Sequence, residues 1–136
     1  MPDGPSSHRL RALLADVNAH DQAKLPTWLA DDVLYAVEGS FEISGRGVVS
    51  SLWRRMFATY ERLGIGLIKC VSTGSIVIAH QNWELGRPGG PPVRLDGMTV
   101  YQFRDDLIAE WRTYLDLRAT SEADRALCSR LRAGRW

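Results

Sequence analysis

The fold is decided by residues 93–117, which read VRLDGMTVYQFRDDLIAEWRTYLDL. Residues 93–104 and 107–117 are rich in β-branched and aromatic side chains, as strands are. Asp105-Asp106 between them is typical of a tight turn. The stretch therefore predicts two long antiparallel strands.

The chain before this pair of strands is expected to contain mostly helices at first and further strands later. The expected elements are a helix with the apolar stripe Leu10, Leu13, Leu14 and Val17, a shorter helix over 21–29, a strand over 33–37, an extended piece over 41–43, the longest helix over 47–63, strands over 66–71 and 75–85, and a last helix over 121–131. Helices followed by short-linked antiparallel strands predict an α+β fold. We expect a strongly curved, mixed and mostly antiparallel sheet that wraps over the helices and encloses a cone with an internal pocket.

Composition limits what such a domain does. A chain of 136 residues is the size of one domain, so we expect a single domain over residues 1–136. Its 17 basic and 16 acidic side chains give a formal net charge of +1. This charge disfavours nucleic acid as a partner, and the absence of a long apolar run disfavours a membrane. We expect a cytoplasmic protein. Cys70 and Cys128 lie far apart and the three histidines are scattered, so no metal site is expected.

Two stretches carry a family resemblance. The block EWRTYLDLR at 110–118, with YQFRDDLIA directly before it, resembles the last two strands of limonene-1,2-epoxide hydrolase-like proteins. DDVLYAV at 31–37, followed by SGRGVV at 44–49 and a helix, is similar to their first strand and third helix. The superfamily includes SnoaL-like polyketide cyclases and ketosteroid isomerase, whose cone is a cystatin-like α+β barrel. The resemblance, over about residues 8–118, implies a homodimer formed through the open sheet.

The resemblance also implies a site. The family hydrolases use two carboxylates held by an arginine, with a tyrosine and an asparagine that position water. The proton-donating carboxylate corresponds to Glu84, whereas the arginine corresponds to Asn82 and the water-activating carboxylate to Thr113. The tyrosine matches Tyr35, but its companion is Val37. The proton-donating carboxylate of the family site is thus retained, whereas most of the residues that activate and position water are replaced.

Period-two alternation in residues 75–85 puts His80, Asn82 and Glu84 on one face, with Val77 and Trp83 on the other. We expect the first set to project into the pocket and the second to offer dimer contacts. Desolvation there would raise the pKa of Glu84 so that it donates a proton, and His80 would act as a base or orient a carbonyl.

Each assignment has an alternative. Glu84 also fits a solvated ion pair with Arg87 or Arg94, and His80 a bond to a backbone carbonyl. Tyr35 either offers its hydroxyl to the pocket or only packs. Glu38 is a reserve carboxylate whose register is off by one unless a bulge at Gly39 restores it. The expected substrate-binding positions, which equally suit a plain core, are Trp53, Met56, Leu95, Tyr101, Trp111 and Thr113.

Three functions follow. The first is an enzyme without metal or organic cofactor that opens an epoxide, cyclises or isomerises an apolar polyketide- or terpenoid-like molecule. In it Glu84 donates a proton, and Asn82, His80 and Tyr35 orient the substrate. The second is a true epoxide hydrolase in which His80 or Glu38 replaces the lost base. The third is a non-catalytic ligand-binding or dimerisation module.

Overall fold

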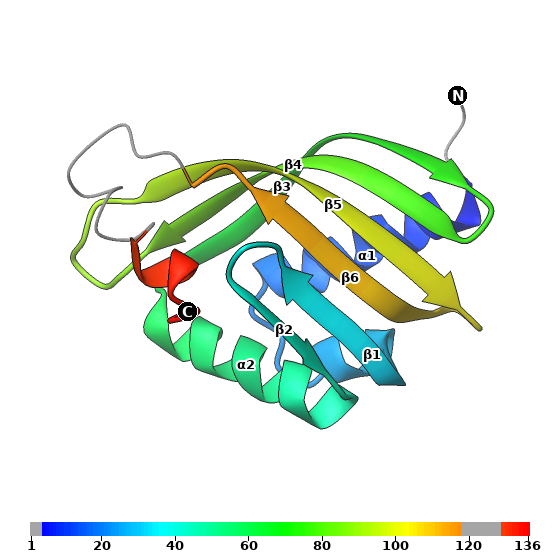
Figure 1. The fold of residues 1–136 in the computed structure, drawn as a ribbon, viewed down its shortest axis with the longest axis horizontal. Helices are drawn as coiled ribbons and strands as arrows, with labels where there is room; N and C mark the ends of the chain where they lie inside the picture. Colours follow the sequence, from blue (N-terminus) through cyan, green and yellow to red (C-terminus); the bar gives the residue numbers. More distant parts are fainter. Residues whose placement is uncertain (1–3, 118–128) are drawn as a thin grey trace.

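A curved sheet wraps around two α-helices in the computed structural model, which describes residues 4–117 and 129–136 (Figure 1). In chain order its elements are α1 (Pro5–Asn18), the 3-10 helix η1 (Leu25–Trp28), β1 (Leu29–Val37), β2 (Phe41–Ser44), α2 (Arg46–Thr59), β3 (Arg62–Thr73), β4 (Ile76–Gly86), β5 (Val93–Arg104) and β6 (Leu107–Leu115). In the described part of the chain, no helix is long and apolar enough to cross a membrane.

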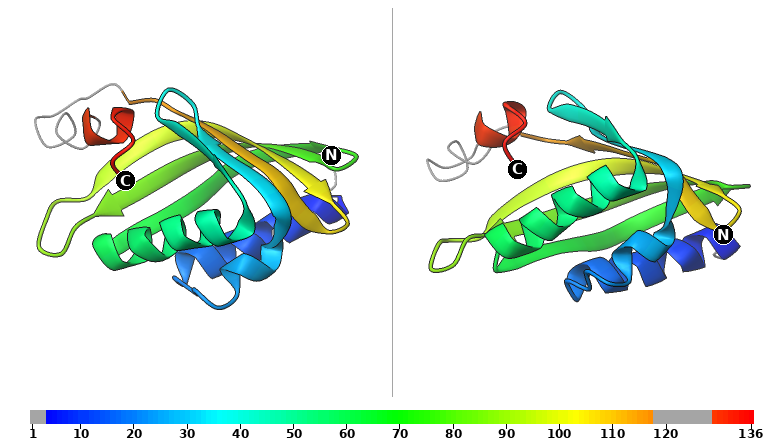
Figure 2. Two further views of the ribbon diagram at one scale, coloured as in Figure 1. Left: turned by 60° about the horizontal axis from the view of Figure 1, so that its bottom comes forward. Right: turned by 90° about the horizontal axis from the view of Figure 1, so that it is seen from below.

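The sheet has the strand order β2-β1-β6-β5-β4-β3. Every neighbouring pair is antiparallel except β1 and β6, which run parallel. The expected α+β fold with a mixed, mostly antiparallel sheet is confirmed. The sheet is not closed, so β2 and β3 are edge strands, and Figure 2 shows the helices on one side of the curved sheet.

Local chemistry explains the strand ends. Asp105 and Asp106 both have positive φ, 52° and 66°, which is the geometry of the tight hairpin turn that the sequence predicts. At the β3 edge, the Ile65 N–H donates to Asn18 Oδ1 at 2.7 Å, and Asn18 Nδ2 donates to the Ile65 carbonyl at 3.0 Å. The end of α1 thus occupies edge groups that would otherwise pair with another strand.

Some predicted boundaries are wrong. The helix expected over 21–29 is only the 3-10 turn η1, because Pro26 lacks the N–H that a longer helix needs, and Leu29 already belongs to β1. The helix expected over 47–63 ends at Thr59, and β3 begins before Gly64 and Gly66, which are poor helix formers. Residues 121–128 of the last helix, predicted over 121–131, lie outside the described residues, and residues 129–132 are helical.

The core lies between the concave face of the sheet and the helices. α1 packs on β3 and β4, and α2 packs on β1 and β2. The stripe predicted for α1 is buried as expected. α2 contributes the buried apolar residues Val49, Leu52, Trp53, Met56 and Phe57, whose spacing places them on one helical face. Inward side chains of the strands therefore meet a continuous apolar layer.

Candidate ligand-binding site

The two faces of β4 are the reverse of the expected ones. The buried side chains are Val77, Ala79, Gln81, Trp83 and Leu85. His80, Asn82 and Glu84 lie on the opposite, outer face, so their placement in the interior is wrong. So is the expectation that Val77 and Trp83 offer dimer contacts, because both are fully buried. Period-two alternation tells which residues share a face, but it does not tell which face is buried, because a shift of one residue exchanges the two faces. Burial of the large Trp83 indole favours the face that carries Trp83 as the inner one.

The outer face of β4 carries solvated polar contacts. Glu84 lies between Arg62 and Arg94, with oxygen–nitrogen distances of 3.5 and 3.4 Å. His80 Nε2 lies 3.0 Å from Asp96 Oδ1. The exposed Asn82 and half-buried Glu84 line an open depression of about 670 Å³ together with both arginines. The ion-pair alternative for Glu84 is therefore confirmed with Arg94, and the second partner is Arg62 instead of Arg87.

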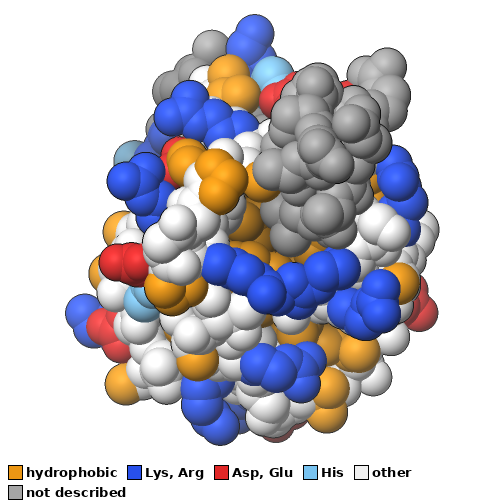
Figure 3. All heavy atoms as spheres, turned by 90° about the vertical axis from the view of Figure 1, so that its left-hand side faces the viewer, with side chains coloured by type: hydrophobic (Ala, Val, Ile, Leu, Met, Phe, Trp, Pro, Cys, Tyr) orange, Lys and Arg blue, Asp and Glu red, His pale blue; other side chains and the backbone are white. Residues whose placement is uncertain are grey.

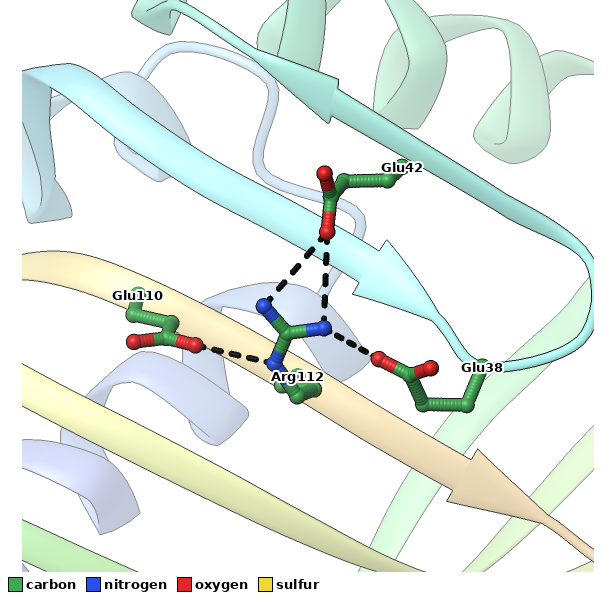
Figure 4. Close-up of polar contacts among 4 residues, drawn as sticks. All are labelled: Glu38, Glu42, Glu110 and Arg112. Atoms are coloured by element: carbon green, nitrogen blue, oxygen red, sulfur yellow. Dashed lines mark hydrogen bonds and ion pairs between the residues drawn. The ribbon is translucent and has the colours of Figure 1, made fainter.

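Glu38 also lies outside the interior. It accepts a hydrogen bond from Arg112 Nη1 on the outer face, as Figure 4 shows. The same guanidinium donates through Nε to Glu110 at 2.9 Å and contacts Glu42 at 3.4 Å. Gly39, at φ +79°, belongs to the β1–β2 turn, and no bulge there turns Glu38 inward. The reserve carboxylate is thus one of three that share a single arginine.

Inside the sheet, β4, β5 and β6 carry a ladder of neutral polar side chains. Thr99 Oγ1 donates to Gln81 Oε1 at 2.8 Å, and Gln81 Nε2 donates to the Tyr101 hydroxyl at 2.7 Å. The Thr99 and Thr113 hydroxyls are 2.9 Å apart and share a hydrogen bond. All four residues are fully buried. Burial raises the pKa of Tyr101, so its hydroxyl stays protonated. We call these four residues the polar ladder.

Beside the ladder lies an aromatic cluster formed by Tyr35, Trp53, Trp83 and Trp111. The Trp53 ring centre lies 6.0 Å from Tyr35, 6.0 Å from Trp83 and 5.2 Å from Trp111. Within the part of the chain that the structure describes, the Tyr35 hydroxyl and the Trp53 and Trp83 indole N–H groups are buried without a hydrogen-bond partner. Such groups normally find a partner when buried. The cluster therefore holds several donors that no acceptor among residues 4–117 and 129–136 satisfies.

Tyr35 is a donor rather than a base in this setting. Burial, with a smaller contribution from nearby Tyr101, raises the pKa of Tyr35 well above its ordinary value. Its hydroxyl therefore keeps its proton throughout the physiological pH range. The predicted inward placement of Tyr35 is confirmed, whereas its proposed role is not tested by this placement.

The residues expected to line the interior do lie there. Trp53, Met56, Leu95, Tyr101, Trp111 and Thr113 are all buried. Sequence reasoning missed Gln81, Trp83 and Thr99, which face the same space; the bulk of Trp83 was the available signal. Among the described residues, no Asp, Glu, Lys, Arg or His is buried in this interior. What the arrangement offers a ligand is aromatic surface and neutral hydrogen-bond donors.

An apolar groove leads toward the cluster. It has a volume of about 670 Å³ and lies between β2 and α2, lined by Phe41, Ile43, Gly47, Val48, Ser51, Leu52, Arg55 and Gly134. Phe41 also packs against Tyr35, with ring centres 5.7 Å apart. Figure 3 views the end of the molecule that carries the C-terminal turn and shows hydrophobic side chains between Lys and Arg side chains. Phe41 is thus both part of the groove wall and in contact with the aromatic cluster.

Known proteins share this fold and part of this sequence. The model of the SnoaL-like domain family matches residues 10–111. An LEH-like epoxide hydrolase from M. tuberculosis is similar in structure, with 23% identity, 82% of each chain covered and a TM-score of 0.76. No protein with a curated description matches the chain.

Two further structures are similar. A protein of ketosteroid isomerase-like fold from Catenulispora acidiphila, in complex with trimethylamine, has 21% identity, covers 82% of this chain and 86% of its own, and gives a TM-score of 0.73. A candidate SnoaL-like polyketide cyclase from Shewanella denitrificans has 14% identity, covers 84% and 92%, and gives a TM-score of 0.76. At these identities the likeness establishes the fold.

Proposed function

The chain belongs to the SnoaL-like domain family, and from this premise we propose that it binds an apolar small molecule bearing an acceptor oxygen inside the aromatic cluster. One observation carries the proposal. In an interior whose described residues include no buried charge, the Tyr35 hydroxyl and the Trp53 and Trp83 N–H groups lack acceptors. A carbonyl, ether or epoxide oxygen would supply the missing acceptor while its hydrocarbon part covers the rings.

The expected ligand is polyketide- or terpenoid-like. The groove volume of about 670 Å³ falls within the range of small-molecule sites, and aromatic walls with few polar groups are their usual lining. Neighbours named as epoxide hydrolase and polyketide cyclase support this ligand class. An ammonium ion, by contrast, would use the aromatic faces but satisfy none of the unpaired donors.

Binding without acid–base chemistry is the hypothesis that the side chains favour. Glu84, His80 and Glu38, on which the two enzyme hypotheses depended, lie on the outer face. General acid–base catalysis needs a titratable group within hydrogen-bond reach of the reacting atoms. Neutral hydroxyl, amide and indole groups cannot serve as that base near neutral pH.

One observation favours a second candidate, an isomerase or cyclase that acts through Tyr35 alone. A tyrosine held protonated by burial can donate to a substrate oxygen and stabilise negative charge that develops on it. In an epoxide-opening cyclisation, the substrate's own hydroxyl would form the new carbon–oxygen bond as the epoxide carbon–oxygen bond breaks, and the hydroxyl proton would pass to the epoxide oxygen that Tyr35 stabilises. Such a reaction needs no carboxylate in the interior.

A matched pair of probes tests the binding proposal. 1-Tetralone and tetralin have similar fused rings, but only the ketone offers an acceptor. We expect 1-tetralone to raise the melting temperature of the protein by at least about 3 °C at saturating concentration, and tetralin to raise it less. Tyr35→Phe, which removes one of the three donors, should reduce the difference between the probes, whereas Tyr60→Phe, which removes a buried hydroxyl outside the cluster, should preserve it. Equal shifts from both probes would reject the proposal.

Turnover separates the two candidates. Wild-type protein and the Tyr35→Phe variant are incubated with epoxide and polyketone substrates in ¹⁸O water. Binding alone predicts no product from either protein. Product formed by wild type and lost in the variant would establish the second candidate, and its ¹⁸O content would show whether water is the nucleophile.

We further propose that two chains associate through the outer face of the sheet. Val71, Ile78 and Val100 lie in register across β3, β4 and β5, beside the exposed Met98 and Tyr114. This apolar row replaces Trp83 and Val77 as the expected contact. Light scattering should report a dimer for wild type and a monomer for Ile78→Glu. Val48→Glu, which changes an exposed residue of α2, is the control that should stay dimeric.

A further inference from the structure

Trp136 enters the aromatic interior from outside the sheet. Its side chain is nearly fully buried, and its ring lies edge-on to Trp83 and Phe41, at centroid distances of 6.0 and 5.6 Å. Trp83 belongs to the aromatic cluster, and Phe41 lines the apolar groove. The Trp136 indole therefore lies where the groove meets the cluster.

The Ser40 hydroxyl makes two hydrogen bonds with the C-terminal segment, residues 129–136. Ser40, in the β1–β2 turn, donates through Oγ to the Leu131 carbonyl, and the same Oγ accepts the Trp136 Nε1–H at 2.9 Å. Gly134, at φ +75°, turns the chain between these two contacts and forms part of the groove wall. Ser40 thus holds both the helical turn at 129–132 and the indole that follows it.

The segment is held by the two Ser40 hydrogen bonds, by a hydrogen bond from Arg132 Nη2 to the Leu117 carbonyl, and by the burial of Leu131 and Trp136. Residues 129–136 belong to no strand, and within the described chain they make no ladder hydrogen bonds with the sheet. Figures 1 and 2 show the C-terminal turn at the end of the sheet remote from the N-terminus. Moving it would break the Ser40 contacts and the hydrogen bond from Arg132 to the Leu117 carbonyl, and would expose the buried Leu131 and Trp136 side chains, but no strand pairing would be lost.

We propose that Trp136 is an internal stand-in for the ligand, occupying the outer part of the binding site until the ligand displaces it. This inference rests on the proposed function and adds the ligand's shape. The ligand places a flat, fused bicyclic ring of indole size between Phe41 and Trp83, and its acceptor oxygen reaches the donors of the cluster beyond. Ring-bearing polyketides fit this description, whereas linear chains do not.

Displacement has a measurable consequence. If Trp136 closes the site in most molecules, the apparent affinity for the ligand is the intrinsic affinity multiplied by the fraction of molecules in which the site is open. Removing Trp136, which we call the plug, therefore strengthens binding. We expect Trp136→Ala to bind 1-tetralone about tenfold or more tighter than wild type in a calorimetric titration. Ser40→Ala, which loosens the plug without opening a cavity, should bind about threefold tighter. Thr59→Ala removes an exposed hydroxyl bonded to the Arg55 carbonyl and should bind as wild type does.

The same titrations with tetralin distinguish the failures. If Trp136→Ala binds both probes equally, the gain reflects only the cavity left by the indole, and the proposed function fails with the plug. If wild type prefers 1-tetralone but neither Trp136→Ala nor Ser40→Ala binds it more tightly, the proposed function stands and the plug is rejected. Should Trp136→Ala not fold, wild-type affinity in folded Ser40→Ala would overturn the plug by itself.

Discussion

The polar ladder and the aromatic cluster lie side by side in one interior, yet they treat their polar groups in opposite ways. Gln81, Thr99, Thr113 and Tyr101 satisfy one another. Tyr35, Trp53 and Trp83 keep donors that nothing in the described chain accepts. A buried donor without a partner costs about 1–3 kcal/mol. The polar ladder therefore stabilises the sheet. The unsatisfied donors of the aromatic cluster lower the stability of the folded protein, and a ligand that accepts their hydrogen bonds would restore it.

Breaking the ladder should have the largest effect. Gln81→Leu keeps the volume but leaves Thr99 Oγ1 and the Tyr101 hydroxyl without their amide partner. We expect it to lower the free energy of unfolding by about 3 kcal/mol in urea titrations. Gln102→Leu, on the outer face, is the control, with a change within about 0.5 kcal/mol. A loss below 1 kcal/mol for Gln81→Leu would mean that the ladder is not a stabilising unit.

Alkaline pH tests both regions together. The folded protein keeps Tyr35 and Tyr101 neutral, because burial raises the pKa of each, whereas the unfolded chain loses both protons near the ordinary value of 10.0. Their contribution is thus complete below pH 10 and falls as pH rises further. Each tyrosine should lower the free energy of unfolding by about 1.4 kcal/mol per pH unit above 10. Tyr35→Phe should remove one share of this slope; an unchanged slope would contradict the burial.

One chemical change should have opposite signs in the two regions. Tyr101→Phe removes an acceptor used by Gln81 and should destabilise the protein by about 1.5 kcal/mol. Tyr35→Phe removes a hydroxyl that has no hydrogen-bond partner among the described residues, and it should stabilise the unliganded protein by about 1 kcal/mol. Differential scanning calorimetry measures both. Shifts of the same sign would show that the two hydroxyls do not differ as described.

The outer face of β4 should give the smallest effect. Glu84→Gln weakens exposed ion pairs with Arg62 and Arg94, which contribute little in water. We expect a stability change within about 0.5 kcal/mol and unchanged affinity for 1-tetralone. A tenfold loss of affinity would return Glu84 to the binding site and refute the assignment of faces.

Sequence reasoning predicted the fold because its signals are local. Alternation, the Asp105-Asp106 turn and the stripe of α1 each depend on a few neighbouring residues. The face of β4 depends instead on what the other strands and α2 pack against it, and a mixed strand gives both faces apolar members. The inward positions Trp53, Trp111 and Thr113 were predicted correctly because their strand or helix has one clearly apolar face.

The polar ladder and the plug could not be predicted from the sequence, for a different reason. The Gln81–Thr99 bond joins residues 18 positions apart, and the Trp136–Ser40 bond joins residues 96 positions apart. Contacts at such separations follow from strand register and chain path, which residue types alone do not specify. Likewise, no sequence pattern distinguishes a tyrosine whose hydroxyl is unpaired from one whose hydroxyl is bonded.

We propose that the donors of the aromatic cluster await an acceptor carried by a ligand. Indole ¹⁵N–¹H spectra of the protein, assigned by single Trp→Phe variants, observe two of those donors directly during titration with 1-tetralone. We expect saturable downfield proton shifts at Trp53 or Trp83 that tetralin does not reproduce. Indole signals that remain unchanged at saturating 1-tetralone, or that shift identically with tetralin, would contradict this proposal.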